Sequence, residues 1–175
     1  MEKGKIKEFS FNQRNQAISR DIIAKYPQKK SAVMPLLDLA QRQNNNYLSK
    51  EVIILIASML EMTEVAVYEV ASFYTMFNLN PVGKNLIQIC GTTPCMLRGA
   101  EAIKKFCQEK LGVGLEELTE DGLFTLREVE CLGACVDAPI VQINDYYHEN
   151  LDVEKMQKII EDLQSGKEIK INNVA

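Results

Sequence analysis

The chain has 175 residues and a mass of 19.8 kDa, which gives room for one ordinary domain or two small ones. With 46% hydrophobic and 25% charged residues, it has enough apolar surface to bury a core, and this composition excludes a disordered chain. The formal charge of −4 divides into ten basic against eight acidic residues over 1–83, and ten against sixteen over 84–175. Neither half has the basic excess of a nucleic-acid-binding protein.

No segment reads as a transmembrane helix, because the longest apolar run, Val52–Leu60, falls far short of the roughly 20 residues that span a bilayer. Residues 1–16 lack the apolar stretch of a signal peptide and the acid-free composition of a transit peptide. We therefore expect a cytoplasmic protein whose five cysteines remain reduced. Metal or redox chemistry is the leading explanation for these cysteines.

Residues 1–80 are predicted to form a helical bundle. Apolar residues recur at helical spacing in four segments, which are separated by Pro27, by the polar run 44–46 and by two N-cap candidates. The apolar positions are Ile18, Ile22 and Ile23; Val33, Leu36, Leu37 and Ala40; Val52, Ile53, Ile56 and Leu60; and Val67, Val70, Ala71 and Tyr74, with Ser49 and Thr63 as the caps. Phe73, Tyr74 and Phe77 are interpreted as core or interface aromatics.

The segment 81–83 marks a boundary, because the hydrophobic period changes after it. Strands are predicted at 86–90, 124–131, 139–144 and 146–149, and helices at about 97–111 and 153–163. This order indicates a small α/β domain over residues 84–166, followed by a C-terminal tail, 167–175. The fold class is therefore an α+β chain in two parts, a helical bundle and an α/β domain.

Four of the cysteines fall in two pairs, Cys90-x4-Cys95 and Cys131-x3-Cys135, each following a predicted strand. Ligands of α/β sheets bind in loops beyond the carboxyl ends of strands, so two such loops can close a four-thiolate site. Four thiolates suit either a structural zinc ion or an iron–sulfur cluster, and the spacing leaves both open. The thioredoxin, c-type haem and plant-type ferredoxin motifs are all missing, and Rieske ligation needs two histidines where this chain has one. A two-iron cluster is the iron–sulfur alternative that remains.

The loops around these cysteines suit a negatively charged cluster, which needs hydrogen-bond donors near its sulfurs. The predicted donors are the backbone of Gly91, Gly133 and Ala134 and the hydroxyls of Thr92 and Thr93. A helix starting near Leu97 would direct the positive end of its dipole towards Cys95. Arg98, in the first turn of that helix, either raises the reduction potential or pairs with a nearby acid, and the second interpretation is favoured.

Three other residues receive structural interpretations. Cys107 shares a helix face with Ile103 and Leu111, which predicts a small buried hydrophobe and not a ligand. His148 is predicted to be a solvated side chain in a polar turn, and Asp137 a surface acid. The chain also lacks a glycine-rich dinucleotide motif, a phosphate loop and a nucleophile with a histidine base. We therefore expect an electron carrier with no catalytic residues of its own, whose partner performs the chemistry.

Four segments carry a resemblance to a known family. They are VYEVASFYTMF at 67–77, PVGK at 81–84, CGTTPCMLRG at 90–99 and ECLGACVDAPIVQIN at 130–144. These segments resemble the 24 kDa subunits of respiratory NADH:quinone oxidoreductase (complex I), and the resemblance extends over about residues 17–166.

The resemblance implies a helical N-terminal bundle over 1–80 that docks a partner, and a thioredoxin-like ferredoxin domain that binds one [2Fe-2S] cluster. By motif match, the cluster ligands fall on Cys90, Cys95, Cys131 and Cys135. The aromatic residues implied for docking are Tyr68, Phe73, Tyr74 and Phe77.

In this family the subunit binds the flavoprotein subunit, which holds FMN and oxidises NADH. The cluster exchanges an electron with FMN but lies off the main chain of clusters that leads to quinone. The resemblance therefore implies other peripheral-arm subunits as further partners, and a location at the cytoplasmic face of a bacterial inner membrane without insertion into it. No nucleic-acid partner is expected.

Three alternatives remain at this stage. The first is the equivalent diaphorase subunit of an NAD-linked hydrogenase or formate dehydrogenase. The second is a DNA-binding regulator, because residues 49–74 resemble a helix-turn-helix, although residues 31–78 carry two basic against five acidic side chains. The third is a zinc-stabilised interaction module, which would contain no sulfide.

Overall fold

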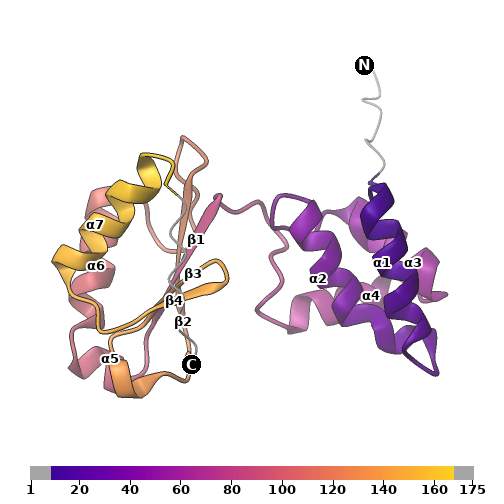
Figure 1. Cartoon of the computed structure of the whole chain (residues 1–175), viewed down its shortest axis with the longest axis horizontal. Helices are drawn as coiled ribbons and strands as arrows, with labels where there is room; N and C mark the ends of the chain where they lie inside the picture. The colour runs from indigo at the N-terminus through magenta and orange to yellow at the C-terminus, as the bar shows by residue number, and fades with distance from the viewer. Residues whose placement is uncertain (1–8, 168–175) are drawn as a thin grey trace. The chain divides into compact units, whose positions relative to one another are not determined.

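The structure, a computed structural model, describes residues 9–167, and the chain divides into two compact units between Pro81 and Val82 (Figure 1). Of the predicted tail, 167–175, only Lys167 lies within the described residues. Helices fill the first unit, and helices with a four-stranded sheet form the second. This mixture confirms the predicted fold class. None of the helices between residues 9 and 167 combines the length and apolar character needed to cross a bilayer.

The first unit is an assembly of helices. Its elements are α1 (Gln13–Ala24), the 3₁₀ helix η1 (Lys29–Ala32), α2 (Val33–Gln43), α3 (Lys50–Leu60) and α4 (Glu64–Phe73). Thr63 caps α4 as predicted, because its hydroxyl accepts a hydrogen bond from the Ala66 amide at 3.2 Å. Ser49 occupies the N-cap position of α3, but its side chain bonds no backbone amide of that helix.

The core of this unit contains most of the predicted apolar positions. Its fully buried side chains include Leu36, Leu37, Val52, Ile56 and Val67. The aromatic residues divide between core and surface, since Phe77 is 5% exposed whereas Phe73 is 77% exposed. Buried Gln41 fixes the chain after α4, because its amide accepts a hydrogen bond from Asn78 N and donates one to Met76 O.

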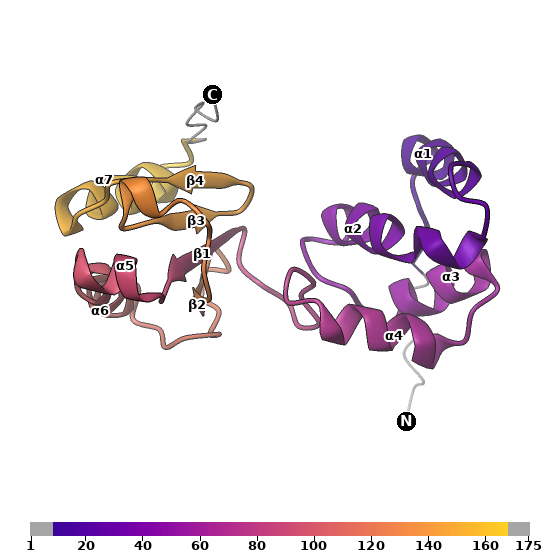
Figure 2. The same ribbon diagram turned by 90° about the horizontal axis from the view of Figure 1, so that it is seen from below.

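The second unit is built on a four-stranded sheet of order β2-β1-β3-β4. Its elements are β1 (Asn85–Cys90), α5 (Thr93–Leu97), α6 (Ala100–Leu111), β2 (Phe124–Val129), η2 (Cys135–Asp137), β3 (Val141–Ile143), β4 (Tyr146–His148) and α7 (Val153–Gln164). Strands β1 and β2 are parallel, and β3 pairs antiparallel with both β1 and β4. Helices α6 and α7 lie side by side on one face of the sheet (Figures 1 and 2).

The core of the second unit lies between this sheet face and the two helices. Alternate strand residues point into it, as period-two patterning requires, and they include Ile87, Ile89, Phe124, Leu126 and Val141. Burial of these side chains fixes the strand register, because a slip by one residue would turn them out of the core. The register in turn brings the ends of β1 and β2, where the cysteine segments begin, to the same edge of the sheet.

The predicted helix over 97–111 is wrong in its start and its continuity. Two helices, α5 and α6, are separated at Arg98 and Gly99, and Gly99 adopts a left-handed φ of 104° that a non-glycine side chain resists. The first helix begins at Thr93, earlier than predicted. Pro94 lies in its first turn, where proline is tolerated. Cys95 therefore lies inside the short α5, and the helix that we expected to start near Leu97 starts instead at Ala100.

Candidate metal centre

The four paired cysteines come from four different pieces of local structure. Cys90 is the last residue of β1, Cys95 lies in α5, Cys131 follows β2 in a loop, and Cys135 begins η2. The first two thiols are buried and the last two are exposed, and none of the five cysteines forms a disulfide. The candidate site therefore has an inner pair of thiols and an outer pair that reaches the surface.

Short-range interactions connect all four thiols. Cys90 and Cys95 each influence the pKa of the other, and Cys131 raises the pKa of Cys135. Cys135 also interacts electrostatically with both Cys90 and Cys95. The structure thus brings together the four cysteines that the spacing singled out.

Hydrogen bonds stabilise the thiolate form of Cys90. Burial raises its pKa, but the Thr92 hydroxyl and the backbone amides of Thr92 and Leu132 outweigh burial and lower the pKa overall. The Cys90 Sγ to Thr92 Oγ1 distance is 3.2 Å. This thiol is therefore prepared to bind a metal as thiolate.

Burial and neighbouring sulfurs act in the opposite direction on two other thiols. Burial raises the pKa of Cys95, and its contacts with Cys90 raise it further. The pKa of Cys135 is raised by desolvation and by the adjacent Cys131. Four thiolates at this spacing repel one another, so a bound cationic centre is what would allow all of them to ionise together.

The donor set fits a two-iron, two-sulfide cluster. Such a cluster takes four cysteine thiolates, two on each iron, and it is stabilised by hydrogen bonds to sulfur. Within residues 9–167, no group of three or more Cys, His, Asp or Glu side chains surrounds a single position suited to one metal ion. Two pairs of thiolates around two irons do not require a group of three at one point.

The predicted backbone and hydroxyl donors are present only in part. The Gly133 amide donates to Cys131 Sγ at 3.4 Å, and Thr92 bonds Cys90 as described. Gly91 was expected to act in the same way, but its amide continues the β ladder by donating to Val129 O at 2.8 Å. Gly133 adopts φ 82°, a left-handed conformation that suits glycine and turns the chain back at this point.

Arg98 connects the two cysteine segments. Its Nε donates a hydrogen bond to the carbonyl oxygen of Ala138 at 2.9 Å. The favoured expectation of a carboxylate partner is therefore wrong, since the bond goes to a backbone carbonyl three residues after Cys135. The guanidinium ties the end of α5 to the chain that follows η2.

Sequence reasoning missed Tyr147. Its phenol hydroxyl donates to the carbonyl oxygen of Leu132 at 2.8 Å, so β4 holds the loop that carries Cys131. In the sequence, Tyr147 was only one residue of a predicted strand. A tyrosine in the hairpin that follows the second cysteine pair is a weak signal, because its partner depends on the tertiary fold.

The other two candidate residues have contrasting outcomes. Cys107 is fully buried in α6, and burial raises its pKa to about 12, which confirms it as a buried hydrophobe. The expectation for His148 is wrong, because this side chain is 2% exposed. Desolvation lowers its pKa, and Nδ1 has no hydrogen-bond partner within the described chain. His148 also lines a pocket of about 290 Å³ whose lining includes no cysteine.

Known proteins resemble this chain over most of its length. Residues 19–164 match the family described as thioredoxin-like [2Fe-2S] ferredoxin. A relative from Rickettsia bellii, named as a subunit of NADH-quinone oxidoreductase, is 58% identical over 163 residues, which are 92% of this chain and 98% of that protein. The mitochondrial NADH dehydrogenase [ubiquinone] flavoprotein 2 of Dictyostelium discoideum is 46% identical over 165 residues, 93% of this chain and 67% of that protein.

Among solved structures, a chain of the NAD+-reducing [NiFe]-hydrogenase in the air-oxidised state superposes with a TM-score of 0.67 and 20% identity. The match covers 74% of this chain and 23% of the hydrogenase chain, and at this identity it shows a common fold alone. The family match spans both units, and the close relatives share nearly the whole length of the chain. This chain therefore belongs to the thioredoxin-like [2Fe-2S] ferredoxin family.

Proposed function

We propose that this chain is the electron-transfer subunit of an NADH:quinone oxidoreductase, respiratory complex I, and that it holds one [2Fe-2S] cluster on Cys90, Cys95, Cys131 and Cys135. The observation that carries the proposal is the convergence of these four free thiols, with hydrogen-bond donors at Cys90 and Cys131. Rickettsia relatives named as NADH-quinone oxidoreductase subunits, at 53–58% identity, support the assignment to this enzyme. A bound cluster of this type takes up and releases one electron at a time.

The surface beside the outer thiols favours close approach by a partner. Val136 is 93% exposed and Leu97 83% exposed, and Met96 is also exposed. We call these three residues the thiol-side patch, since Met96 and Leu97 follow Cys95 in the sequence and Val136 follows Cys135. Exposed apolar side chains of this kind exclude water when a partner binds over them, which brings its electron carrier near the thiols.

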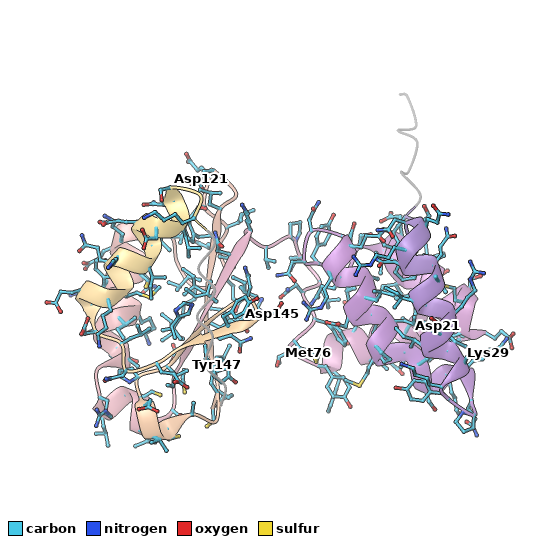
Figure 3. All side chains as sticks on the ribbon, in the orientation of Figure 1. Asp21, Lys29, Met76, Asp121, Asp145 and Tyr147 are labelled. Carbon is cyan, nitrogen blue, oxygen red and sulfur yellow. The ribbon has the colours of Figure 1, made fainter. Side chains whose placement is uncertain are left out.

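A second exposed apolar surface lies on the first unit, along α4 and the residues that follow it. We call it the α4 face, and it consists of Val65, Tyr68, Phe73, Tyr74 and Met76 (Figure 3 labels Met76). Aromatic and methionine side chains are enriched at protein interfaces. We assign this face to docking of the flavoprotein subunit, which would hold FMN and oxidise NADH. Phe77, included in the predicted docking set, is buried and supports the fold instead.

The chain supplies thiols, donors and docking surfaces, and its partner supplies the reaction with NADH. The glycine-rich and phosphate-binding motifs of nucleotide sites are missing from the sequence. We therefore place the protein with the other peripheral-arm subunits of complex I, on the cytoplasmic face of a bacterial inner membrane.

Purification under anaerobic conditions tests the cluster. We expect about two irons and a matching amount of acid-labile sulfide per chain, and an electron paramagnetic resonance signal after dithionite reduction. Alanine at Cys90, Cys95, Cys131 or Cys135 should abolish or severely damage this signal. Alanine at Cys107 is the matched control and should preserve it, because that thiol is buried in α6 and burial alone, with no other cysteine, shifts its pKa. Zinc without sulfide, or equal iron loss in the Cys107→Ala variant, would refute the proposal.

The second candidate is the diaphorase subunit of an NAD-linked hydrogenase, which is favoured by the fold shared with the NAD+-reducing enzyme. Isolation of the native complex through this chain distinguishes the two. If the chain belongs to complex I, it should be recovered together with membrane subunits. The isolated complex should also reduce quinone in a reaction that rotenone-type inhibitors block. A soluble complex that contains nickel and reduces NAD+ with hydrogen would support the alternative.

A further inference from the structure

Two hydrogen bonds meet on one peptide group beside Cys131. The Tyr147 hydroxyl donates to the Leu132 carbonyl oxygen at 2.8 Å, and the Gly133 amide donates to Cys131 Sγ at 3.4 Å. The carbonyl of Leu132 and the N–H of Gly133 belong to the same planar peptide group. The phenol, the peptide and the sulfur therefore form one continuous chain of donors and acceptors.

Hydrogen bonds arranged in this way polarise one another. A proton donated to the carbonyl oxygen draws electron density from the peptide nitrogen, which makes the N–H a stronger donor to sulfur. In an iron–sulfur centre, hydrogen bonds to the sulfurs stabilise the more negative reduced form and so contribute to the reduction potential. Outer residues that orient and polarise the ligand environment are an established way of tuning metal sites.

We propose that Tyr147 tunes the reduction potential of the centre at Cys131 by polarising the Leu132–Gly133 peptide group. This inference rests on the proposed function, since it requires a redox centre at the four thiols. Tyr147 acts through the peptide and makes no described contact with a cysteine, so it is a positioning residue and not a ligand.

The local structure suits such a role. Tyr147 is partly buried against the core of its unit, and its strand pairs with β3 through Gln142, so the position of the ring is fixed by the sheet. Gly133 has the left-handed φ that returns its amide towards Cys131. The neighbouring Tyr146 lies on the same strand, and its hydroxyl makes no hydrogen bond within residues 9–167.

The test compares Tyr147→Phe with Tyr146→Phe in the complete protein purified anaerobically. We expect both variants to keep wild-type iron and sulfide, because each retains the aromatic ring. The midpoint potential, measured by resonance-monitored redox titration, should fall in Tyr147→Phe and remain unchanged in Tyr146→Phe. Pulsed resonance in H2O and D2O should also show a weaker coupling to an exchangeable amide proton in Tyr147→Phe alone.

A merely mechanical role would alter iron retention without shifting the potential of the loaded protein. An unchanged potential in a fully loaded Tyr147→Phe variant overturns the inference and leaves the proposed function intact. If Tyr147→Phe loses iron, the test uses site-specific Tyr147→3-fluorotyrosine, whose hydroxyl is a stronger donor on a ring of similar size. This variant must raise the midpoint potential at pH 7. An unchanged or lower potential overturns the inference. A wild-type chain that binds no iron would defeat both proposals, and this result is distinct from the others.

Discussion

Arg98 Nε and the Ala138 carbonyl oxygen are joined by a hydrogen bond of 2.9 Å. Because Arg98 follows α5 and Ala138 follows η2, this bond links the segment that carries Cys95 to the segment that carries Cys135. The two segments are separated by about forty residues in the chain. A side chain that bridges them helps to set the spacing between inner and outer thiols before any metal binds.

The substitution Arg98→Met should make the centre less stable. It keeps much of the apolar stem but removes the charged donor, and a hydrogen bond from a charged group contributes about 1.5–3 kcal/mol. We expect iron release to a chelator to become roughly ten-fold faster, with little change in helix content. Lys105→Met, on the exposed side of α6, is the control. Equal release rates in the two variants would show that the bridge does not hold the site.

The cysteine pairs could be identified from sequence because strand periodicity places each pair after a predicted strand. The position of Cys95 relative to a helix could not, since it depends on the left-handed conformation of Gly99. A glycine after an apolar segment permits that conformation but does not require it. The break between α5 and α6 was therefore missed.

The hairpin residues show a different limit of sequence reasoning. His148 looks polar and lies near Glu149 and Asn150, which favours solvent, yet its pairing with Val141 turns it into the core. The adjacent Tyr147 turns towards the loop of Cys131 instead. In a strand of three residues, neighbours across the sheet decide where each side chain points, and local composition carries little of that information.

Buried His148 predicts a stability that depends on pH. Desolvation lowers its pKa below the ordinary value of 6.5, so the unfolded chain binds the proton more readily. The contribution of neutral His148 to the free energy of unfolding is full above about pH 6.5. It is lost as the pH falls from there through the lowered pKa of the folded state. His148→Leu should flatten this dependence, and because the chain has one histidine no other imidazole obscures it. The measurement is the thermal midpoint of the wild-type protein and of His148→Leu between pH 5.5 and 7.5. Parallel curves of midpoint against pH would contradict the prediction.

The thiol of Cys107 should be chemically inert in the folded chain. Burial raises its pKa to about 12, so the reactive thiolate is scarce at pH 8 and the sulfur is also inaccessible. After the metal is removed, iodoacetamide should modify the exposed Cys131 and Cys135 first. Mass spectrometry of digested protein measures each site, and unfolding in urea should make Cys107 react as well. Rapid alkylation of Cys107 in the folded chain would be inconsistent with its place in the core.

The α4 face predicts a separable binding defect. Phe73 is 77% exposed, so Phe73→Ser should change the free energy of unfolding by no more than about 0.5 kcal/mol. If its ring docks the flavoprotein subunit, its loss should weaken association by about 2 kcal/mol, or roughly thirty-fold. Tyr26→Ser is the matched control, because Tyr26 is an exposed aromatic residue that follows α1 in the same unit. Titration of the purified flavoprotein with each variant measures the affinity. Unaltered binding by Phe73→Ser would remove the α4 face from the interface, while the cluster content of the same sample would show that the ferredoxin unit is intact.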